Sequence, residues 1–173
     1  MKSIIDTSTL ISFARIAYLE LIPMLRRDVS IPDEIYKEAV LKGEEKGFAD
    51  ATVIKKFIER HRIKILSVKT RSLMSLRKKI NRILTKGDEA VLSLALQEKA
   101  NEVMANDDGL GRIAMALGLH VKATPDLLLE GLRGSTLGLQ DFEVFVRSLV
   151  IENRLSPAVA ELYIVEGRKD VEG

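Results

Sequence analysis

Hydrophobic and polar positions follow two different periods along this chain of 173 residues. Short apolar runs, typical of buried strands, alternate with longer stretches in which apolar residues recur every three or four positions, as on one face of a helix. Strands that alternate with helices are joined by right-handed crossovers and form a mainly parallel sheet. The pattern therefore predicts an α/β fold, with strands at the apolar run that ends at Ile5 and at residues 28–32, 63–68, 102–107 and 120–124.

Helical periodicity fills the segments between these strands. The first helix follows Asp6, and we expect Pro23 to close or kink it near Ile22, because proline has no N–H for the preceding turn. A basic stretch at 71–84 has apolar residues at helical spacing, and the segment 88–100 is apolar on nearly all sides, which predicts a buried helix. Other helices are expected at residues 33–42, 49–60 and 109–119.

A glycine-rich break at residues 131–138 interrupts the pattern of alternating strands and helices. Two helices are predicted beyond it, and the second begins where Ser156 precedes Pro157, a typical helix start. We therefore expect a main domain over residues 1–133 and a C-terminal helical extension over residues 139–173 that packs on the same domain.

Four acids stand where a parallel sheet would bring them together. Asp6 ends the first strand and Asp107 ends the fourth, so both belong to the carboxyl edge, where open α/β sheets bind ligands. Asp88 begins a helix that runs antiparallel to the following strand and so starts at the same edge, and Glu38 faces partly inward on the second helix. Converging carboxylates repel unless a cation neutralises them, and oxygen ligands without His or Cys favour Mg²⁺ or Mn²⁺.

Each of these acids also has an ordinary structural interpretation. Asp88 completes the capping-box pattern of the segment TKGD, and Asp108 could simply cap the helix that follows it. Glu38 by itself is typical of an exposed helix acid. Asp6 is harder to explain in this way, because a carboxylate at the end of a buried strand is costly unless it is paired or ligated.

The composition narrows the class of protein. The chain has no cysteine, which excludes disulfides and thiolate metal sites. His61 and His120 lack the spacing of metal ligands, and no Walker-type phosphate loop is present. The N-terminus lacks a signal-peptide pattern, and no apolar run approaches the roughly 20 residues of a membrane helix, so we expect a cytoplasmic protein without a membrane partner.

The net charge of +2 conceals an uneven distribution of charged residues. Residues 55–86 hold twelve of the 27 Lys and Arg residues but one acid, Glu59. A basic block of this kind often contacts phosphates, although a solvated helix face would carry the same charges. The block favours a polyanionic partner without identifying it.

Four segments, taken in order, resemble the PIN-domain family. They are IIDTSTLISFARI, VSIPDEIYKEAV, LTKGDEAVLSLALQ and VMANDDGLGRIAMALGL, within residues 3–131. The resemblance implies a three-layer α/β/α fold with a central sheet of about five strands and a C-terminal helical pair. Members of this family are Mg²⁺- or Mn²⁺-dependent nucleases, many of them VapC-type toxins of toxin–antitoxin pairs.

The resemblance assigns roles to individual residues. It implies that the metal-binding and catalytic acids are Asp6, Glu38, Asp88 and Asp107, with Asp108 as a further metal ligand. It implies that the site is supported by Ser8, Glu89 and Arg112. If the polyanion is RNA, we expect the basic block to hold its backbone, above all through Arg77, Lys78, Lys79 and Arg82. The chain departs from the family pattern at Ala105, where many members carry a hydroxyl residue. A second departure is in the third segment. The subgroup that the chain most resembles often has two acids there separated by one residue, whereas Asp88 and Glu89 are adjacent.

These expectations describe an endoribonuclease that cleaves single-stranded RNA by in-line attack of a metal-activated water, leaving a 5′-phosphate and a 3′-hydroxyl. The resemblance also implies a homodimer and, for a toxin, an antitoxin protein as partner. One alternative is a catalytically weak or inactive module that binds nucleic acid or protein. Another is a phosphatase of the haloacid dehalogenase type with Asp6 as nucleophile, although that family expects a second acid where this chain has Ser8.

Overall fold

The computed structural model describes all residues, Met1–Gly173, and is built on one five-stranded sheet. The strands are β1 (Lys2–Ile5), β2 (Asp28–Pro32), β3 (Lys64–Leu66), β4 (Glu102–Met104) and β5 (His120–Lys122). Their order is β3-β2-β1-β4-β5 and every neighbouring pair is parallel. The predicted α/β class and parallel sheet are therefore confirmed.

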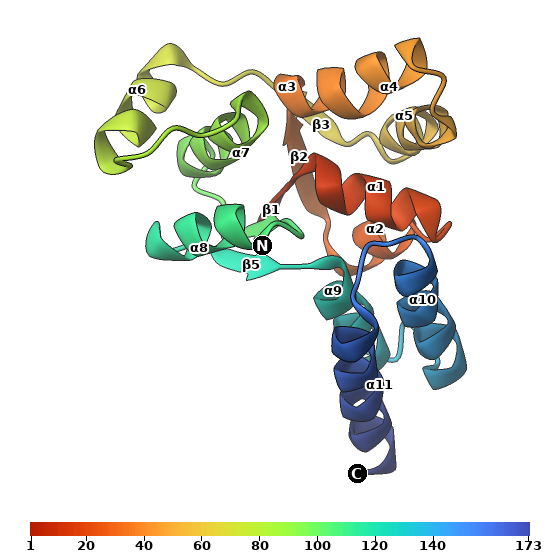
Figure 1. Ribbon diagram of the computed structural model, residues 1–173. Helices are drawn as coiled ribbons and strands as arrows, with labels where there is room; N and C mark the ends of the chain where they lie inside the picture. Colours follow the sequence, from red (N-terminus) through yellow and green to blue (C-terminus); the bar gives the residue numbers. More distant parts are fainter.

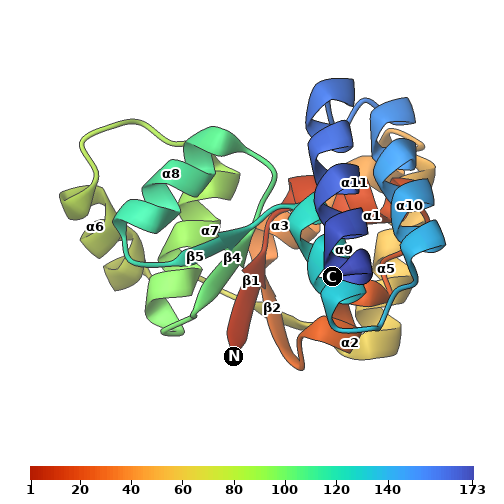
Figure 2. The same cartoon turned by 90° about the horizontal axis from the view of Figure 1, so that it is seen from below.

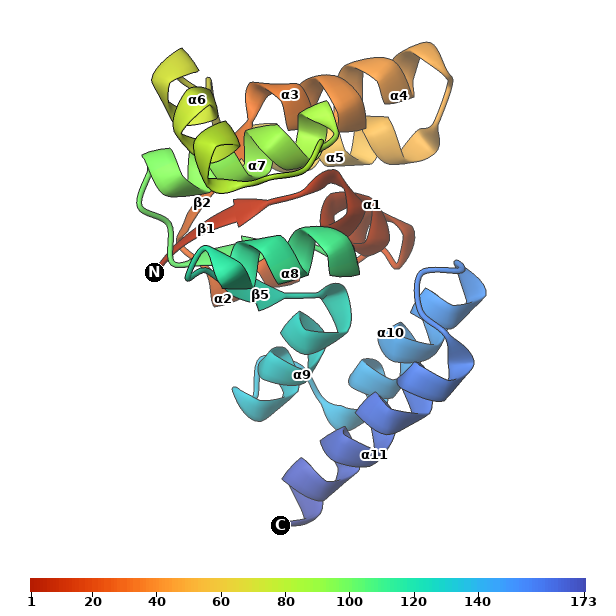
Figure 3. The same ribbon diagram turned by 60° about the vertical axis from the view of Figure 1, so that its left-hand side comes forward.

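Helices cover both faces of the sheet and make the expected three layers (Figures 1 and 3). The first half of the chain contributes α1 (Thr7–Arg15), α2 (Leu21–Leu25), α3 (Asp33–Tyr36), a π-helical turn η1 (Lys37–Leu41), α4 (Lys42–Glu45) and α5 (Ala49–His61). The second half contributes α6 (Thr70–Lys79), α7 (Lys86–Gln97), α8 (Asp108–Ala116), α9 (Thr124–Arg133), α10 (Leu139–Ile151) and α11 (Pro157–Glu172). In Figure 3, α6, α7 and α3 to α5 are drawn above β1, α8 lies between β1 and β5, and α9 lies below β5.

A continuous apolar core joins these layers. The central strands β1 and β4 carry Ile4, Ile5, Val103 and Met104, all completely buried. Helix α7 packs against β1, β2 and β4 and buries most of its length, which confirms the buried helix expected from its sequence. The same core of 37 buried residues extends to Phe142 and other side chains of α10 and α11.

The C-terminal helices α10 and α11 pack against each other and against α9 (Figure 2). A polar contact fixes this docking, because the Tyr163 hydroxyl donates to Asp126 Oδ1 at 2.5 Å. Burial raises the pKa of Tyr163, and the bond to the Asp126 carboxylate raises it further, so the phenol stays protonated and keeps donating. The expected C-terminal helical pair is thus present.

Two expected helix boundaries are wrong. The first helix ends at Arg15, not near Ile22, because Ala17 adopts a left-handed conformation with φ of 56° that breaks the helix. Pro23 lies in the first turn of the separate helix α2, where its missing N–H has no partner to lose.

The basic helix also ends earlier than its spacing indicates. It stops at Lys79, since Ile80 is extended and the chain must return to the carboxyl edge of the sheet before α7 can begin. Ile83, expected on the apolar stripe, is 98% exposed in the connecting loop.

Helix α9 was not expected from the sequence. It begins after Ala123, whose N–H donates to Asp126 Oδ2 at 2.8 Å, and Pro125 lies in its first turn. Its buried leucines fill the space between α2 and the C-terminal pair. The helix therefore links the sheet to the extension.

The amino edge of the sheet contains a buried ionic network. Arg26 is 5% exposed and Glu102 is 1% exposed. The Arg26 guanidinium donates Nε and Nη2 to Glu102 at 2.9 and 3.0 Å, and Nη1 and Nη2 to Glu130 at 2.6 and 2.9 Å. Ser3 Oγ donates to Glu102 Oε1 at 2.9 Å, so the network joins β1, β4 and α9.

Candidate active site

The strand order reverses between β1 and β4, and the carboxyl edge at this switch point carries the predicted acids. Asp6 follows β1 and Asp107 lies three residues beyond the end of β4. The two segments are directly bonded, because the Asp6 N–H donates to the Met104 carbonyl at 2.9 Å. Ligands of open α/β sheets bind in the crevice at this point.

Asp6 is held in place by the helix that it caps. Its side chain is 8% exposed, and its Oδ2 accepts from the Ser8 N–H at 3.2 Å and from Ser8 Oγ at 2.6 Å. Ser8 Oγ in turn accepts from the Asn106 N–H at 3.1 Å. Ser8 therefore stands where the sequence placed it, in direct contact with the first acid.

Asp107 and Asp88 also sit at helix starts. Asp107 caps α8 and its Oδ1 accepts from the Leu110 N–H at 2.7 Å, while its second oxygen has no protein donor. The Asp88 N–H donates to Thr85 Oγ1 at 3.1 Å, as the capping pattern predicted. Because helix N-termini favour negative charge, an acid at either position can stabilise its helix and also belong to an acidic site.

Glu38 reaches the same edge from the π-helical turn η1. Its carboxylate lies against the start of α7, where a Cβ atom at Gly87 would stand 2.9 Å from Glu38 Oε2. Glycine at this position therefore lets the Glu38 carboxylate lie beside Asp88. π-Helical turns of this kind occur frequently at functional sites.

The charges of the four acids act on one another. Burial raises the pKa of Glu38, and the Asp6 and Asp88 carboxylates raise it further, while Lys42 partly opposes them. Burial also raises the pKa of Asp88; the bond to Thr85 lowers it, and the Asp6 and Asp107 carboxylates raise it again. The structure thus brings all four predicted acids into one electrostatic cluster.

The donor chemistry of this cluster fits a hard divalent cation. All of its charged groups are carboxylates, and the Gly87 space keeps the Glu38 oxygen at the cluster. No three Asp, Glu or His side chains converge closely enough to hold a metal as they stand. Like charges repel, so a divalent cation that offsets the repulsion would stabilise these carboxylates near one another.

The other predicted support residues lie around the cluster. Glu89 points to Arg77, whose Nε and Nη2 donate to it at 2.5 and 3.0 Å, so its charge is already paired. Asp108 and Arg112 line a cavity of about 570 Å³ together with Asp107. Arg112 Nε donates to the Asp108 carbonyl at 3.3 Å and bonds to no carboxylate.

Sequence reasoning missed Asn106, which organises the site. Its Nδ2 donates to the Ser8 carbonyl at 3.2 Å and to Ser12 Oγ at 3.0 Å, and its Oδ1 accepts from the Thr124 N–H at 2.7 Å. One side chain therefore ties the loop after β4 to α1 and α9. The only sequence signal was its place immediately before Asp107.

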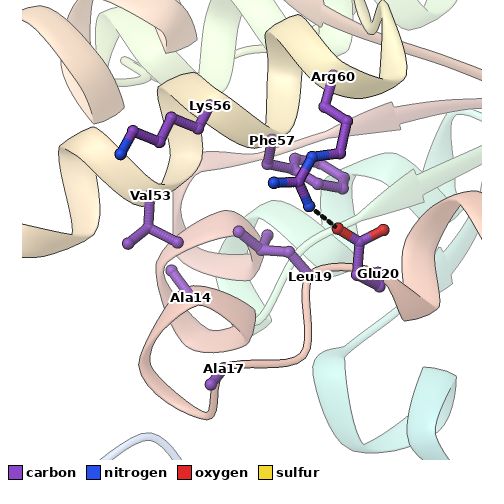
Figure 4. Close-up of a pocket in the computed structure, with 8 residues that line it drawn as sticks. All are labelled: Ala14, Ala17, Leu19, Glu20, Val53, Lys56, Phe57 and Arg60. Carbon is purple, nitrogen blue, oxygen red and sulfur yellow. Dashed lines mark hydrogen bonds and ion pairs between the residues drawn. The ribbon is translucent and has the colours of Figure 1, made fainter.

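An apolar groove of about 290 Å³ lies elsewhere, between α1 and α5 (Figure 4). Its lining includes Val53, Leu19 and Phe57, and its one acid, Glu20, accepts from Arg60 Nη1 at 3.1 Å. A groove with its acid already paired to a cation offers no free acid–base pair, so the carboxylate cluster remains the chemical site.

The fold and this edge define a parallel α/β protein with a group of carboxylates at its switch point. A family model described as PIN domain matches residues 2–165, nearly the whole chain. The chain therefore belongs to the PIN-domain family, whose members are generally nucleases and typically metal-dependent. Among curated proteins, none matches the sequence significantly. None of the helices combines the length and apolar character needed to cross a membrane.

Proposed function

We propose that this protein is a Mg²⁺- or Mn²⁺-dependent endoribonuclease that acts on single-stranded RNA. The observation that carries the proposal is that Glu38 and Asp88 both feel the charge of Asp6, and Asp88 also that of Asp107, at the switch point of the sheet. Four carboxylates placed together without a bridging cationic side chain cost free energy, and metal binding relieves that cost.

The protein residues have separate tasks in this reaction. Asp6, Glu38, Asp88 and Asp107 would hold the metal. The metal, when bound, polarises the scissile phosphate and lowers the pKa of the attacking water. Ser8 fixes the Asp6 carboxylate, and Asn106 fixes Ser8, so the first ligand is oriented before substrate arrives. Asp108, which lines the same cavity as Asp107, is proposed as an additional ligand.

The basic block supplies one route for the RNA backbone. Lys78, Lys79 and Arg82 are exposed and form no ion pair, whereas Arg77 is bonded to Glu89. Arg82 lies close enough to the cluster for its charge to lower the pKa of Asp88. We assign Arg82 to the phosphate nearest the site and the other three residues to more distant contacts, which high salt should weaken.

One observation favours a second function, that of a catalytically weak or inactive interaction module. The carboxylates do not converge as they stand, so a metal must draw them together before any reaction. A homodimer and an antitoxin protein are proposed partners under either function. Nothing in the fold or its family supports the phosphatase alternative.

Cleavage of labelled single-stranded RNA by the purified protein tests the proposal. Cutting should require Mg²⁺ or Mn²⁺, stop with EDTA, and be lost in Asp6→Asn and Asp107→Asn. Asp141→Asn, which changes an exposed acid on α10, is the matched control and should cut normally. Cutting that survives in both site variants would refute the assignment of the acids, and metal binding without cutting would favour the interaction module.

A further inference from the structure

A second groove begins at the acidic cluster and leads away from the basic block. It has a volume of about 300 Å³ and lies between α1, the η1–α4 segment and the connection between α10 and α11 (Figure 1). Glu38 lines its inner end. Four cations line the remainder, namely Arg15, Lys42, Lys46 and Arg154.

Three of these cations have no partner within the protein. Arg15 pairs with Asp50 at 3.0 Å, but the side chains of Lys42, Lys46 and Arg154 form no ion pair and donate no hydrogen bond. Arg154 is half-buried, and burial followed by the charge of Arg15 lowers its pKa. A guanidinium that is partly desolvated beside a like charge is stabilised when an anion binds.

The cations are arranged outward from the acid. Glu38, Lys42 and Lys46 follow one another along the helical segment, and all three line the groove. Lys42 lies near enough to Glu38 for its charge to lower the pKa of that carboxyl. An extended chain with regularly spaced negative charges could therefore pass from the cluster along this segment.

The rim of the groove carries an aromatic side chain. Phe48 also lines it and is 56% exposed, so its ring is accessible to a ligand in the groove. Unpaired cations beside an exposed aromatic face are the combination by which proteins bind single-stranded nucleic acid, since the cations contact phosphates and the ring stacks on a base.

We propose that this groove binds the single-stranded RNA segment next to the scissile phosphate, with Lys42, Lys46 and Arg154 on phosphates and Phe48 against a base. This inference rests on the proposed ribonuclease function and extends it. The C-terminal extension thereby gains a role in substrate binding, because Arg154 belongs to the connection between α10 and α11. The acidic cluster would then lie between two cationic surfaces, the basic block on one side and this groove on the other.

Binding without cleavage tests the groove directly. The probe is a fluorescein-labelled single-stranded RNA of about 20 nucleotides, long enough to cover several contacts, and its anisotropy is followed in EDTA at a series of salt concentrations. The double variant Lys46→Gln/Arg154→Gln should bind roughly tenfold more weakly. Its plot of log affinity against log salt should be flatter by about 1.4, because each lost phosphate contact on a single strand contributes about 0.7.

The controls separate a specific groove from general charge. Lys56→Gln/Lys169→Gln removes the same charge from exposed positions on α5 and α11 and should keep the wild-type slope. Phe48→Ala should weaken binding of the single strand roughly tenfold, whereas Met24→Ala, another exposed apolar residue, should not. Thermal melts confirm that each variant is folded.

The results distinguish this inference from the proposed function. Equal salt slopes for the two double variants would overturn the groove assignment. It would also be overturned if a duplex RNA bound as tightly as the single strand and its affinity were the same in Phe48→Ala. Salt-dependent binding through the groove without metal-dependent cutting would support the groove and refute the nuclease. Cutting that is unaffected in Lys46→Gln/Arg154→Gln at low RNA concentration would support the nuclease and refute the groove.

Discussion

Gly87 lies so close to Glu38 that a Cβ atom added at Gly87 would stand 2.9 Å from Glu38 Oε2. Gly87→Ala should therefore displace that carboxylate from the cluster while leaving the fold intact, because the displaced atom is the end of a flexible side chain. The melting temperature should stay equal or rise slightly, since alanine suits the first turn of α7 better than glycine. Metal affinity, measured by calorimetric titration with Mn²⁺, should fall roughly tenfold, which is about 1.4 kcal/mol.

Gly138→Ala is the matched control for this prediction. A Cβ atom at Gly138 meets no atom within 4 Å, so this variant should bind Mn²⁺ like the wild type. Unchanged Mn²⁺ affinity in Gly87→Ala would show that Glu38 does not contact the metal.

Asn106 connects three segments, and its loss should affect both stability and the site. Asn106→Ala removes the hydrogen bonds that its side chain makes to Ser12 Oγ, the Ser8 carbonyl and the Thr124 N–H, which should lower the free energy of unfolding by about 1–3 kcal/mol. RNA cleavage per folded molecule should also fall, because Ser8 then orients Asp6 less firmly. Urea unfolding and the cleavage assay, with the exposed Asn81→Ala as control, give the two measurements. A loss of stability with full activity would limit Asn106 to a structural role.

The network at the amino edge should matter for stability alone. Arg26→Ala leaves Glu102 buried and unpaired, and should lower the free energy of unfolding by about 3–5 kcal/mol. Arg168→Ala removes an equally well-formed pair with Glu143, but one that is exposed, and should lower the free energy of unfolding far less. Denaturant titration compares the two variants, and similar losses in both would contradict the importance of burial.

The acidic cluster predicts a particular dependence of stability on pH. Burial and neighbouring carboxylates raise the pKa of Glu38 and of Asp88, so the folded chain retains their protons to a higher pH than the unfolded chain. Stability without metal should therefore decrease as pH rises from the ordinary carboxyl pKa near 4 through these raised values. Glu38→Gln should reduce that decrease and raise the melting temperature in EDTA at neutral pH by about 1–3 °C, a small gain because the group is solvent-screened.

A melting series over pH in EDTA measures this effect. The control is Glu45→Gln, which removes an exposed acid without an ion pair from α4, the helix that follows η1. Its melting temperature should vary with pH as that of the wild type does. Addition of Mg²⁺ should stabilise the wild type at neutral pH more than Glu38→Gln, because binding to the folded state alone adds stability. Parallel curves for wild type and Glu38→Gln would show that the carboxylates do not repel.

The fold, and the position of Asp6 and Asp107 on one edge of it, could be predicted because they depend on local patterns. Apolar runs locate the strands, and parallel strands place Asp6 and Asp107 on one edge without any knowledge of side-chain contacts. The end of the basic helix at Lys79 could not be predicted, because Ile83 continues the helical spacing although the chain must turn back.

Contacts between distant segments could not be predicted from the sequence either. Asn106 bonds to residues of α1 and α9 that nothing in its neighbourhood indicates, and Arg26 pairs with Glu102, 76 positions away. The same is true of the groove. Arg154 reaches Arg15 only because the C-terminal helices pack back onto α9, which is a property of the whole fold.

The pairing of β1 with β4 sets the order in which the protein can become functional during synthesis. Ser3 lies opposite Glu102, 99 positions later, so the central pair of strands cannot form until most of the chain has been made. Asp6 leaves the ribosome well before its neighbour Asp107, which arrives only after that pairing is possible. A nascent or truncated chain that ends before β4 therefore lacks both Asp107 and the strand that pairs with β1, so its acidic edge stays incomplete.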